Sequence, residues 1–180
     1  TANFDPNIFT PLPSYTNISR TGNWNTSQNR DVSAAYLQDI WDVHQSLRLI
    51  IGARYDHYSD VGGSFNPRSS LSWEFIEDSR LLFSYGTAFR APNFGELYND
   101  NNPGALGNPD LNPEEIETYE VSIDTVFNKR TNAHATLFRN EISDVIDFRN
   151  IVASNLGKLE VNGLELELSS RLRNGSNLNL

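Results

Sequence analysis

The feature that most constrains the fold is an alternation of apolar and polar residues that recurs along most of the chain. Between residues 47 and 56, for example, Leu47, Leu49 and Tyr55 alternate with Arg48 and Arg54. Successive side chains of a β-strand point to opposite faces, so this spacing predicts strands with one apolar and one charged face. Comparable segments lie at residues 31–41, 68–75, 80–86, 118–127, 132–142, 164–172 and 177–180. We therefore expect an all-β chain with seven strands and the start of an eighth.

Hydropathy excludes a helical membrane protein. Hydrophobic residues make up 38% of the chain, and no apolar run approaches the ~20 residues that a membrane-spanning helix needs. In a transmembrane barrel only alternate residues of each strand face lipid, so the average hydropathy stays like that of a soluble protein. The alternation alone is compatible with both a transmembrane barrel and a soluble sheet.

The lengths of the connections favour the barrel, because short and long connections alternate along the chain. Short connections are expected near residues 42–45, 76–79, 128–131 and 173–176, and long ones at 59–65, 90–117 and 143–158. If consecutive strands pair antiparallel, all short turns lie on one rim and all long loops on the other. This asymmetry is typical of bacterial outer-membrane barrels. Residues 1–29 are then the tail of an earlier outer loop.

Two separated motifs flank the longest predicted loop. A strand ends in Phe-Arg-Ala-Pro, and Asn-Pro-x-Leu-x-Pro-Glu leads into the next strand. In this order the motifs resemble the signature of TonB-dependent outer-membrane receptors, and segments 140–146 and 155–165 are similar to the late-barrel region of that family. The matching positions are Phe89, Arg90, Ala91, Pro92, Glu96, Leu97, Tyr98, Asn108, Pro109, Leu111, Pro113 and Glu114.

The resemblance implies a partial, antiparallel, up-and-down transmembrane β-barrel, with residues 1–180 as part of one barrel domain. Complete receptors of the family have a plugged barrel of about 22 strands. Here the plug domain, the motif that contacts TonB and the closing strand are not recognisable. The chain also has no Met and no signal peptide. We therefore expect a middle-to-late barrel segment of a longer protein.

The same resemblance implies a function. Such a receptor binds a metal-organic nutrient (a ferric siderophore, haem or cobalamin) and imports it across the bacterial outer membrane with energy supplied through TonB. Its partners are that ligand, its own plug, TonB and outer-membrane lipid. Two other classes remain open from the sequence. One is a small structural or adhesive outer-membrane barrel, and the other is a soluble β-sandwich binding module.

Candidate ligand-facing positions lie in or next to the predicted outer loops. They are Tyr58, Arg90, Glu96, Tyr98 and Asp100. A structural interpretation competes at Arg90, because Pro92 ends ladder pairing and nearby carboxylates can satisfy the arginine. The charged faces of the strands are interpreted as a hydrated inner wall. This wall carries Arg48, Arg54, Arg68, Glu74, Glu120, Asp124, Glu165, Glu167 and Arg171.

Other kinds of site have little support in the sequence. The chain has no Cys, and its three histidines are isolated, so neither a metal site nor a cofactor is expected. Nothing resembles a nucleophile elbow, which argues against an enzyme. The net charge of −9 and the scattered basic residues argue against a nucleic-acid partner.

Overall fold

The computed structural model describes residues 2–4, 11–16, 27–172 and 176–180. The strands and the single short helix assigned in these ranges are β1 (Ala2–Phe4), β2 (Pro11–Thr16), β3 (Val32–His44), β4 (Leu47–Tyr58), β5 (Gly62–Ile76), β6 (Ser79–Arg90), α1 (Phe94–Tyr98), β7 (Glu114–Asn128), β8 (Thr131–Ser143), β9 (Ile146–Arg149), β10 (Val152–Asn155), β11 (Leu159–Arg171) and β12 (Asn177–Asn179). In this part of the chain, no helix has the length and apolar character needed to cross a membrane.

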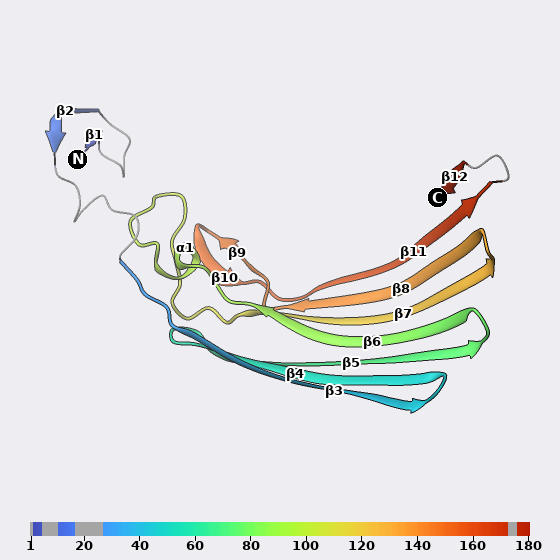
Figure 1. Ribbon diagram of the computed structural model, residues 1–180. Coiled ribbons are helices and arrows are strands. Elements are labelled where there is room, and N and C mark those ends of the chain that lie inside the picture. Colours follow the sequence, from blue (N-terminus) through green and yellow to red (C-terminus); the bar gives the residue numbers. More distant parts are fainter. Residues whose placement is uncertain (1, 5–10, 17–26, 173–175) are drawn as a thin grey trace.

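Eight strands form one antiparallel sheet in the order β12-β11-β8-β7-β6-β5-β4-β3. Neighbours in the sheet are also neighbours in the chain, except that the small β9–β10 hairpin lies between β8 and β11. The sheet bends into an open trough and does not close on itself (Figure 1). The predicted fold class, an unclosed part of an up-and-down barrel, is confirmed.

The register of the ladder separates the two faces as the alternation predicts. Leu71, Phe83, Val121, Leu137 and Leu164 lie opposite one another along five successive strands and form one apolar row. Leu137 and Leu164 are 59% and 58% exposed, and no second layer of described residues covers this row. A β-sandwich would bury it against a facing sheet. The soluble sandwich considered from the sequence therefore does not fit the structure.

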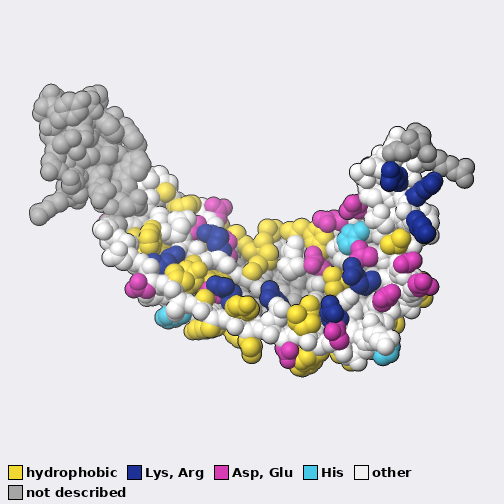
Figure 2. Space-filling view, in the orientation of Figure 1, with side chains coloured by type: hydrophobic (Ala, Val, Ile, Leu, Met, Phe, Trp, Pro, Cys, Tyr) yellow, Lys and Arg dark blue, Asp and Glu magenta, His cyan; other side chains and the backbone are white. Residues whose placement is uncertain are grey.

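The opposite face is polar. The row Glu74, Arg80, Asp124, His134 and Glu167 crosses the same five strands. Asp124 accepts a hydrogen bond from Arg80 (3.0 Å), and its other carboxylate oxygen lies 2.7 Å from Nδ1 of His134. Basic and acidic side chains are interspersed along the sheet in Figure 2. This face is polar, as the sequence predicts, and Arg80, Asp124 and His134 pair across its strands.

Tight turns at residues 45–46, 77–78 and 129–130 gather at one end of the sheet, and the other end carries α1 and the β9–β10 hairpin (Figure 1). The predicted connection at 59–65 is wrong in length, because β5 begins at Gly62 and only residues 59–61 lie outside the strands. Gly62 supplies a positive φ of 85° for the turn. Gly63 is a strand residue over which Tyr55 lies, since a Cβ there would meet the Tyr55 hydroxyl at 2.2 Å.

The two longer loops are also more ordered than expected. Strand β7 begins at Glu114 instead of near residue 118, so the loop predicted at 90–117 spans 91–113 and contains α1. The loop predicted at 143–158 contains β9 and β10. Within residues 1–29, the described parts include β1 and β2, which pair with each other. Of the predicted turn at 173–176, residues 173–175 lie outside the described residues.

Candidate functional site

The long loop is closed at its base by Arg90, the last residue of β6. Its Nε donates to Glu114, the first residue of β7, at 2.6 Å. Its NH1 donates to Glu96 of α1 at 3.0 Å. The side chains of Glu96 and Glu114 are only 14% and 17% exposed, whereas that of Arg90 is 44% exposed, so the carboxylates are shielded and the guanidinium stays partly open to water. Arg90 therefore joins the two strand ends and the loop helix.

Glu96 has a second role as part of a capping box that starts α1. The Asn93 side chain accepts from the backbone N–H of Glu96 at 2.9 Å, and the Glu96 carboxylate accepts from the Asn93 N–H at 2.8 Å. Two N–H groups that the helix cannot satisfy internally are thereby paired. The Glu96 position of the signature thus starts the helix and pairs with Arg90.

A small apolar cluster holds the loop against the β9–β10 hairpin. Leu97 and Leu111 are 1% and 5% exposed and pack with Ala153, which is fully buried. Asn155 adds polar contacts, because its side chain accepts from the Asn112 N–H and donates to the Asn112 carbonyl, both at 3.0 Å. The signature leucines therefore form the core of a packed loop structure.

Hydrogen bonds shift the pKa values of Arg90 and Glu114, which lie at the strand ends beside the long loop. The hydrogen bond from Arg90 lowers the pKa of Glu114 from its usual value, burial opposes this shift, and the Ile146 N–H supports it. The carboxylates of Glu114 and Glu96 raise the pKa of Arg90. Glu114 and Arg90 are therefore both charged at neutral pH.

A second arginine ties the long loop to the neighbouring turn. Arg30 pairs with Asp60 at 2.8 Å and donates to the Pro92 carbonyl at 2.7 Å. Its guanidinium carbon lies 5.4 Å from the centroid of the Tyr58 ring and 5.0 Å from that of Phe94. Both distances fall in the cation–π range. Arg30 thus connects the chain before β3, the β4–β5 turn and the start of the long loop.

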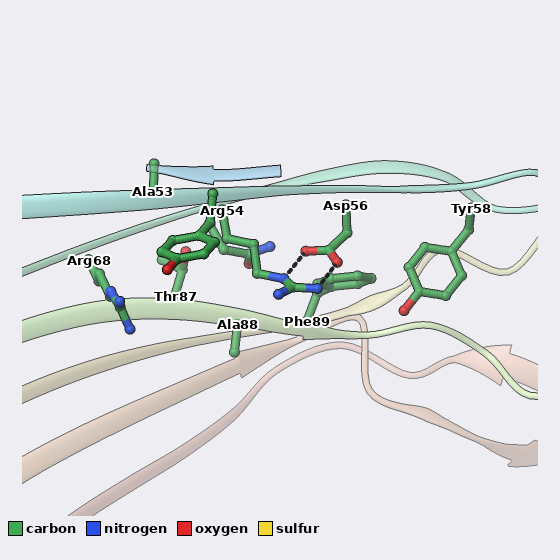
Figure 3. A pocket seen from close by; sticks show the side chains of 10 residues that line it. Ala53, Arg54, Asp56, Tyr58, Arg68, Thr87, Ala88 and Phe89 are labelled. Carbon is green, nitrogen blue, oxygen red and sulfur yellow. Dashed lines mark hydrogen bonds and ion pairs between the residues drawn. The ribbon is translucent and has the colours of Figure 1, made fainter. Parts of the chain in front are cut away.

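Next to this arginine, a hollow of about 520 Å³ opens on the sheet. We define the outer hollow by Tyr36, Arg54, Asp56, Tyr58, Arg68 and Phe89, which line it together with smaller residues. Arg54 forms two hydrogen bonds to Asp56, at 2.6 and 2.7 Å, and the Tyr58 and Phe89 rings meet edge to face at 5.5 Å (Figure 3). Aromatic rings beside guanidinium groups are suited to binding.

The structure does not bring the five candidate ligand residues into one site. Tyr58 lines the outer hollow, whereas Arg90 and Glu96 pair with each other at the loop base. Tyr98 and Asp100 line a separate depression of about 380 Å³ beside Gly107. The outer hollow brings Tyr58 together with Tyr36, Arg54, Asp56, Arg68 and Phe89, none of which was among the five predicted ligand-facing positions. A signal existed in Arg54-x-Asp56-x-Tyr58, whose spacing of two places these side chains on one face at the end of a strand.

No metal centre is apparent in the described ranges, where no three His, Asp or Glu side chains form a group that could hold a cation.

Comparison with known proteins identifies the family. A family model described as the TonB-dependent receptor-like β-barrel matches residues 1–180. A variant of the ferric enterobactin receptor PfeA from Pseudomonas aeruginosa superposes on 83% of this chain, with a TM-score of 0.74 and 22% identity. The siderophore receptor PirA from the same organism covers 80%, with a TM-score of 0.73 and 29% identity. The iron transporter FrpB from Neisseria meningitidis covers 79%, with a TM-score of 0.65 and 21% identity.

The match covers only part of each of these proteins. The chain spans 26% of PfeA, 29% of PirA and 23% of FrpB. Three observations lead to one assignment. The sheet is open, with one exposed apolar face and one polar face, and the signature residues lie at the base of its longest loop. The family model matches the whole chain. The chain belongs to the TonB-dependent receptor-like β-barrel family.

Proposed function

We propose that this chain forms part of the barrel wall of an outer-membrane receptor that binds and imports a ferric siderophore. The observation that carries the proposal is the outer hollow, which brings Tyr58, Phe89, Arg54 and Arg68 together near the loop end of the sheet. The names of the similar structures support this ligand class, since PfeA is a ferric enterobactin receptor and PirA a siderophore receptor. The family and the bare apolar face, which would contact lipid, support an outer-membrane location as part of the proposal.

The chemistry of the hollow agrees with such a ligand. A ferric chelate offers oxygen donors that carry negative charge and, in catecholates, planar rings. Arginine forks match oxyanions, and aromatic side chains stack on planar groups. Energy from TonB and a plug domain inside the bore are included in the proposal on the basis of family membership. Haem and cobalamin carry no comparable support from the similar structures.

The proposal is tested in the full-length receptor with Tyr58→Ala. We expect about a tenfold weaker affinity, which corresponds to about 1.4 kcal/mol, because the variant removes a ring from the hollow and a partner of Arg30. The measurement is equilibrium binding of iron-labelled ferric enterobactin, and of a ferric hydroxamate in parallel, to intact cells.

The matched control is Tyr55→Ala, which removes the same ring from the same strand on the opposite face, where Tyr55 is 48% exposed. Tyr55→Ala should bind like the unmodified receptor once surface levels are equalised. Equal losses in both variants would remove the outer hollow from the site. If neither probe binds the unmodified receptor, the siderophore assignment fails, and a structural or adhesive barrel becomes the better interpretation.

A further inference from the structure

The outer hollow contains a buried carboxylate beside its arginines. Asp56 is 3% exposed, and it is the only acidic residue among the described residues that line the hollow. Both of its carboxylate oxygens accept hydrogen bonds from Arg54, at 2.6 and 2.7 Å (Figure 3). A two-bonded pair of this kind is among the stronger charge-assisted contacts in proteins. The charge of Arg54 is therefore compensated within the hollow, before any ligand arrives.

The sheet gives Asp56 no other basic partner. Arg54 and Asp56 are two residues apart on β4, so their side chains lie on the same face. The residues opposite Asp56 are Ala34 on β3 and Ser64 on β5, and both are uncharged. Among the described residues, Arg54 is the one cation that forms an ion pair with Asp56. The side chain of Arg54 is 57% exposed, so the pair meets water on the arginine side.

Asp56 limits the positive charge of the hollow. Two arginines and one aspartate line it, which leaves one net positive charge, that of Arg68. The guanidinium of Arg68 donates to the side-chain oxygen of Gln38, which is a neutral acceptor. Arg68 also lines a neighbouring hollow that contains Glu120, and this second carboxylate offsets part of its field there. Without Asp56, the outer hollow would carry twice the net positive charge.

We propose that Asp56 is a charge-selectivity residue of the outer hollow. Its carboxylate weakens the binding of chelates that carry a high negative charge, relative to uncharged chelates of similar size. The inference rests on the proposed function and extends it from the ligand class to the charge of the ligand. The relevant difference exists among ferric chelates, because three dianionic catecholates leave Fe³⁺ with a trianionic complex, whereas three monoanionic hydroxamates leave a neutral one.

A purely positioning role for Asp56 predicts the opposite result. If the carboxylate served only to hold Arg54 towards a bound anion, its removal would weaken the binding of a trianionic chelate. If it acts through its charge, its removal strengthens that binding and has a smaller effect on a neutral chelate. The sign of the change in selectivity therefore separates the two roles.

The first experiment is Asp56→Asn in the purified full-length receptor. Asparagine keeps the shape of the side chain and an oxygen that accepts from Arg54. The selectivity ratio is the Kd of a ferric tris-hydroxamate divided by the Kd of ferric enterobactin, and a probe that does not bind directly is measured as a competitor. We expect the ratio to rise about tenfold at low ionic strength, as Coulomb's law gives for a unit charge and a trianion roughly 9 Å apart in water. Added salt should reduce this shift.

The matched control is Asp42→Asn. Asp42 pairs with Arg48 at 2.6 Å on the same two strands, near the tight turn at residues 45–46 and far along β4 from the hollow. Its substitution removes the same charge from a comparable pair, and the selectivity ratio should stay as in the unmodified receptor. An equal rise in both variants would assign the effect to the overall charge of the receptor and overturn the inference.

The second experiment uses Arg54→Gln alone and together with Asp56→Asn. Arg54→Gln leaves the carboxylate uncompensated, so the ratio should fall about tenfold by the same Coulombic argument. The double variant removes both charges and should return the ratio close to its original value. Misfolding lowers the number of binding sites but does not change the ratio of two affinities, so the readout is independent of yield. A ratio as low in the double variant as in Arg54→Gln would exclude a selectivity role for Asp56.

The outcomes distinguish this inference from the proposed function. An unchanged or lower ratio in Asp56→Asn, with weak binding in Tyr58→Ala, would refute the role of Asp56 and leave the outer hollow in place. If neither probe binds the unmodified receptor, directly or as a competitor, the proposed function itself fails.

Discussion

Arg90 ends strand β6 and contacts two carboxylates, one on the loop helix and one on the next strand. Because Glu96 also caps α1, three signature residues act together to fix the base of the loop. The shared role explains their spacing, since the arginine must end one strand, the second carboxylate must begin the next, and the capping glutamate must lie three residues after Asn93. At the scale of single residues, the signature positions therefore stabilise the local structure at the base of the loop.

The ionisation of Glu114 gives a prediction with a definite sign. Its pKa in the folded state is lowered, chiefly by the hydrogen bond from Arg90, so its stabilising contribution is present above the unfolded-state pKa. That contribution is lost as the pH falls through the lowered pKa. Glu114→Gln should therefore be less stable than the unmodified receptor at pH ~7, by roughly 1–2 kcal/mol, with the difference shrinking in acid.

The measurement is thermal or denaturant unfolding of the two proteins at a series of acidic and neutral pH values. Glu115→Gln is the control, because this exposed neighbour forms none of the described ion pairs. A stability difference that stays constant into strong acid would mean that the charge of Glu114 contributes nothing.

The long loop is an element with its own core and is anchored through contacts distant in sequence. The Leu106 N–H donates to the Ile151 carbonyl, and the Leu106 carbonyl accepts from the Ala153 N–H. Asn112 also pairs with Asn155, which is 43 residues away. Only the tip, residues 100–105, extends beyond these contacts. The loop base therefore positions the tip, and Tyr98 and Asp100 stay proposed ligand contacts near it.

Replacing residues 100–105 with a Gly/Ser linker of equal length tests the role of the tip. We expect normal assembly in the outer membrane, since the anchoring contacts at Leu97, Leu111 and Asn155 remain, and about a tenfold loss of siderophore uptake if the tip supplies one good contact. Surface level and uptake are measured on the same cells. Unchanged uptake would exclude the tip, including Asp100, from ligand recognition.

Sequence alone could predict the strands, because alternation depends only on which face each residue occupies. The apolar faces of Leu71, Phe83, Val121 and Leu164 were predicted from a spacing of two. The register that aligns them in one row with Leu137 required the structure. The sequence could not predict that Gly63 belongs to a strand, because the Tyr55 ring that lies over it comes from the neighbouring strand. The outer hollow and the Arg30 contacts also required structure, since residues 30, 58, 60 and 92 meet only after the strands pair.

On the scale of the whole molecule, one face of the sheet is apolar and the other is polar. Its apolar row is exposed and its polar row is cross-paired, and edge strands β3 and β12 have no further neighbour among the described residues. These properties agree with a segment of a larger barrel, of which the chain covers about a quarter in similar structures. The two faces should therefore respond differently to the same substitution.

Leu137→Arg places a charge in the middle of the apolar row, where an arginine costs about 2–4 kcal/mol if the row faces lipid. The control Glu165→Arg lies on the opposite face, next to Leu164, and should have little effect because water surrounds it. Folding into lipid vesicles is followed by denaturant titration of the full-length receptor. Equal costs for the two variants would contradict a lipid-facing row.

Arg30 links ligand binding in the outer hollow to the long loop. The same guanidinium touches the Tyr58 ring, which lines the outer hollow, and the Phe94 ring and Pro92 carbonyl at the start of the long loop. A molecule that reorients Tyr58 changes the energy of those other contacts. Occupancy of the hollow and the resting position of the loop are thereby thermodynamically linked. Ligand binding shifts the position of the loop, and the position of the loop shifts the ligand affinity by the same free energy.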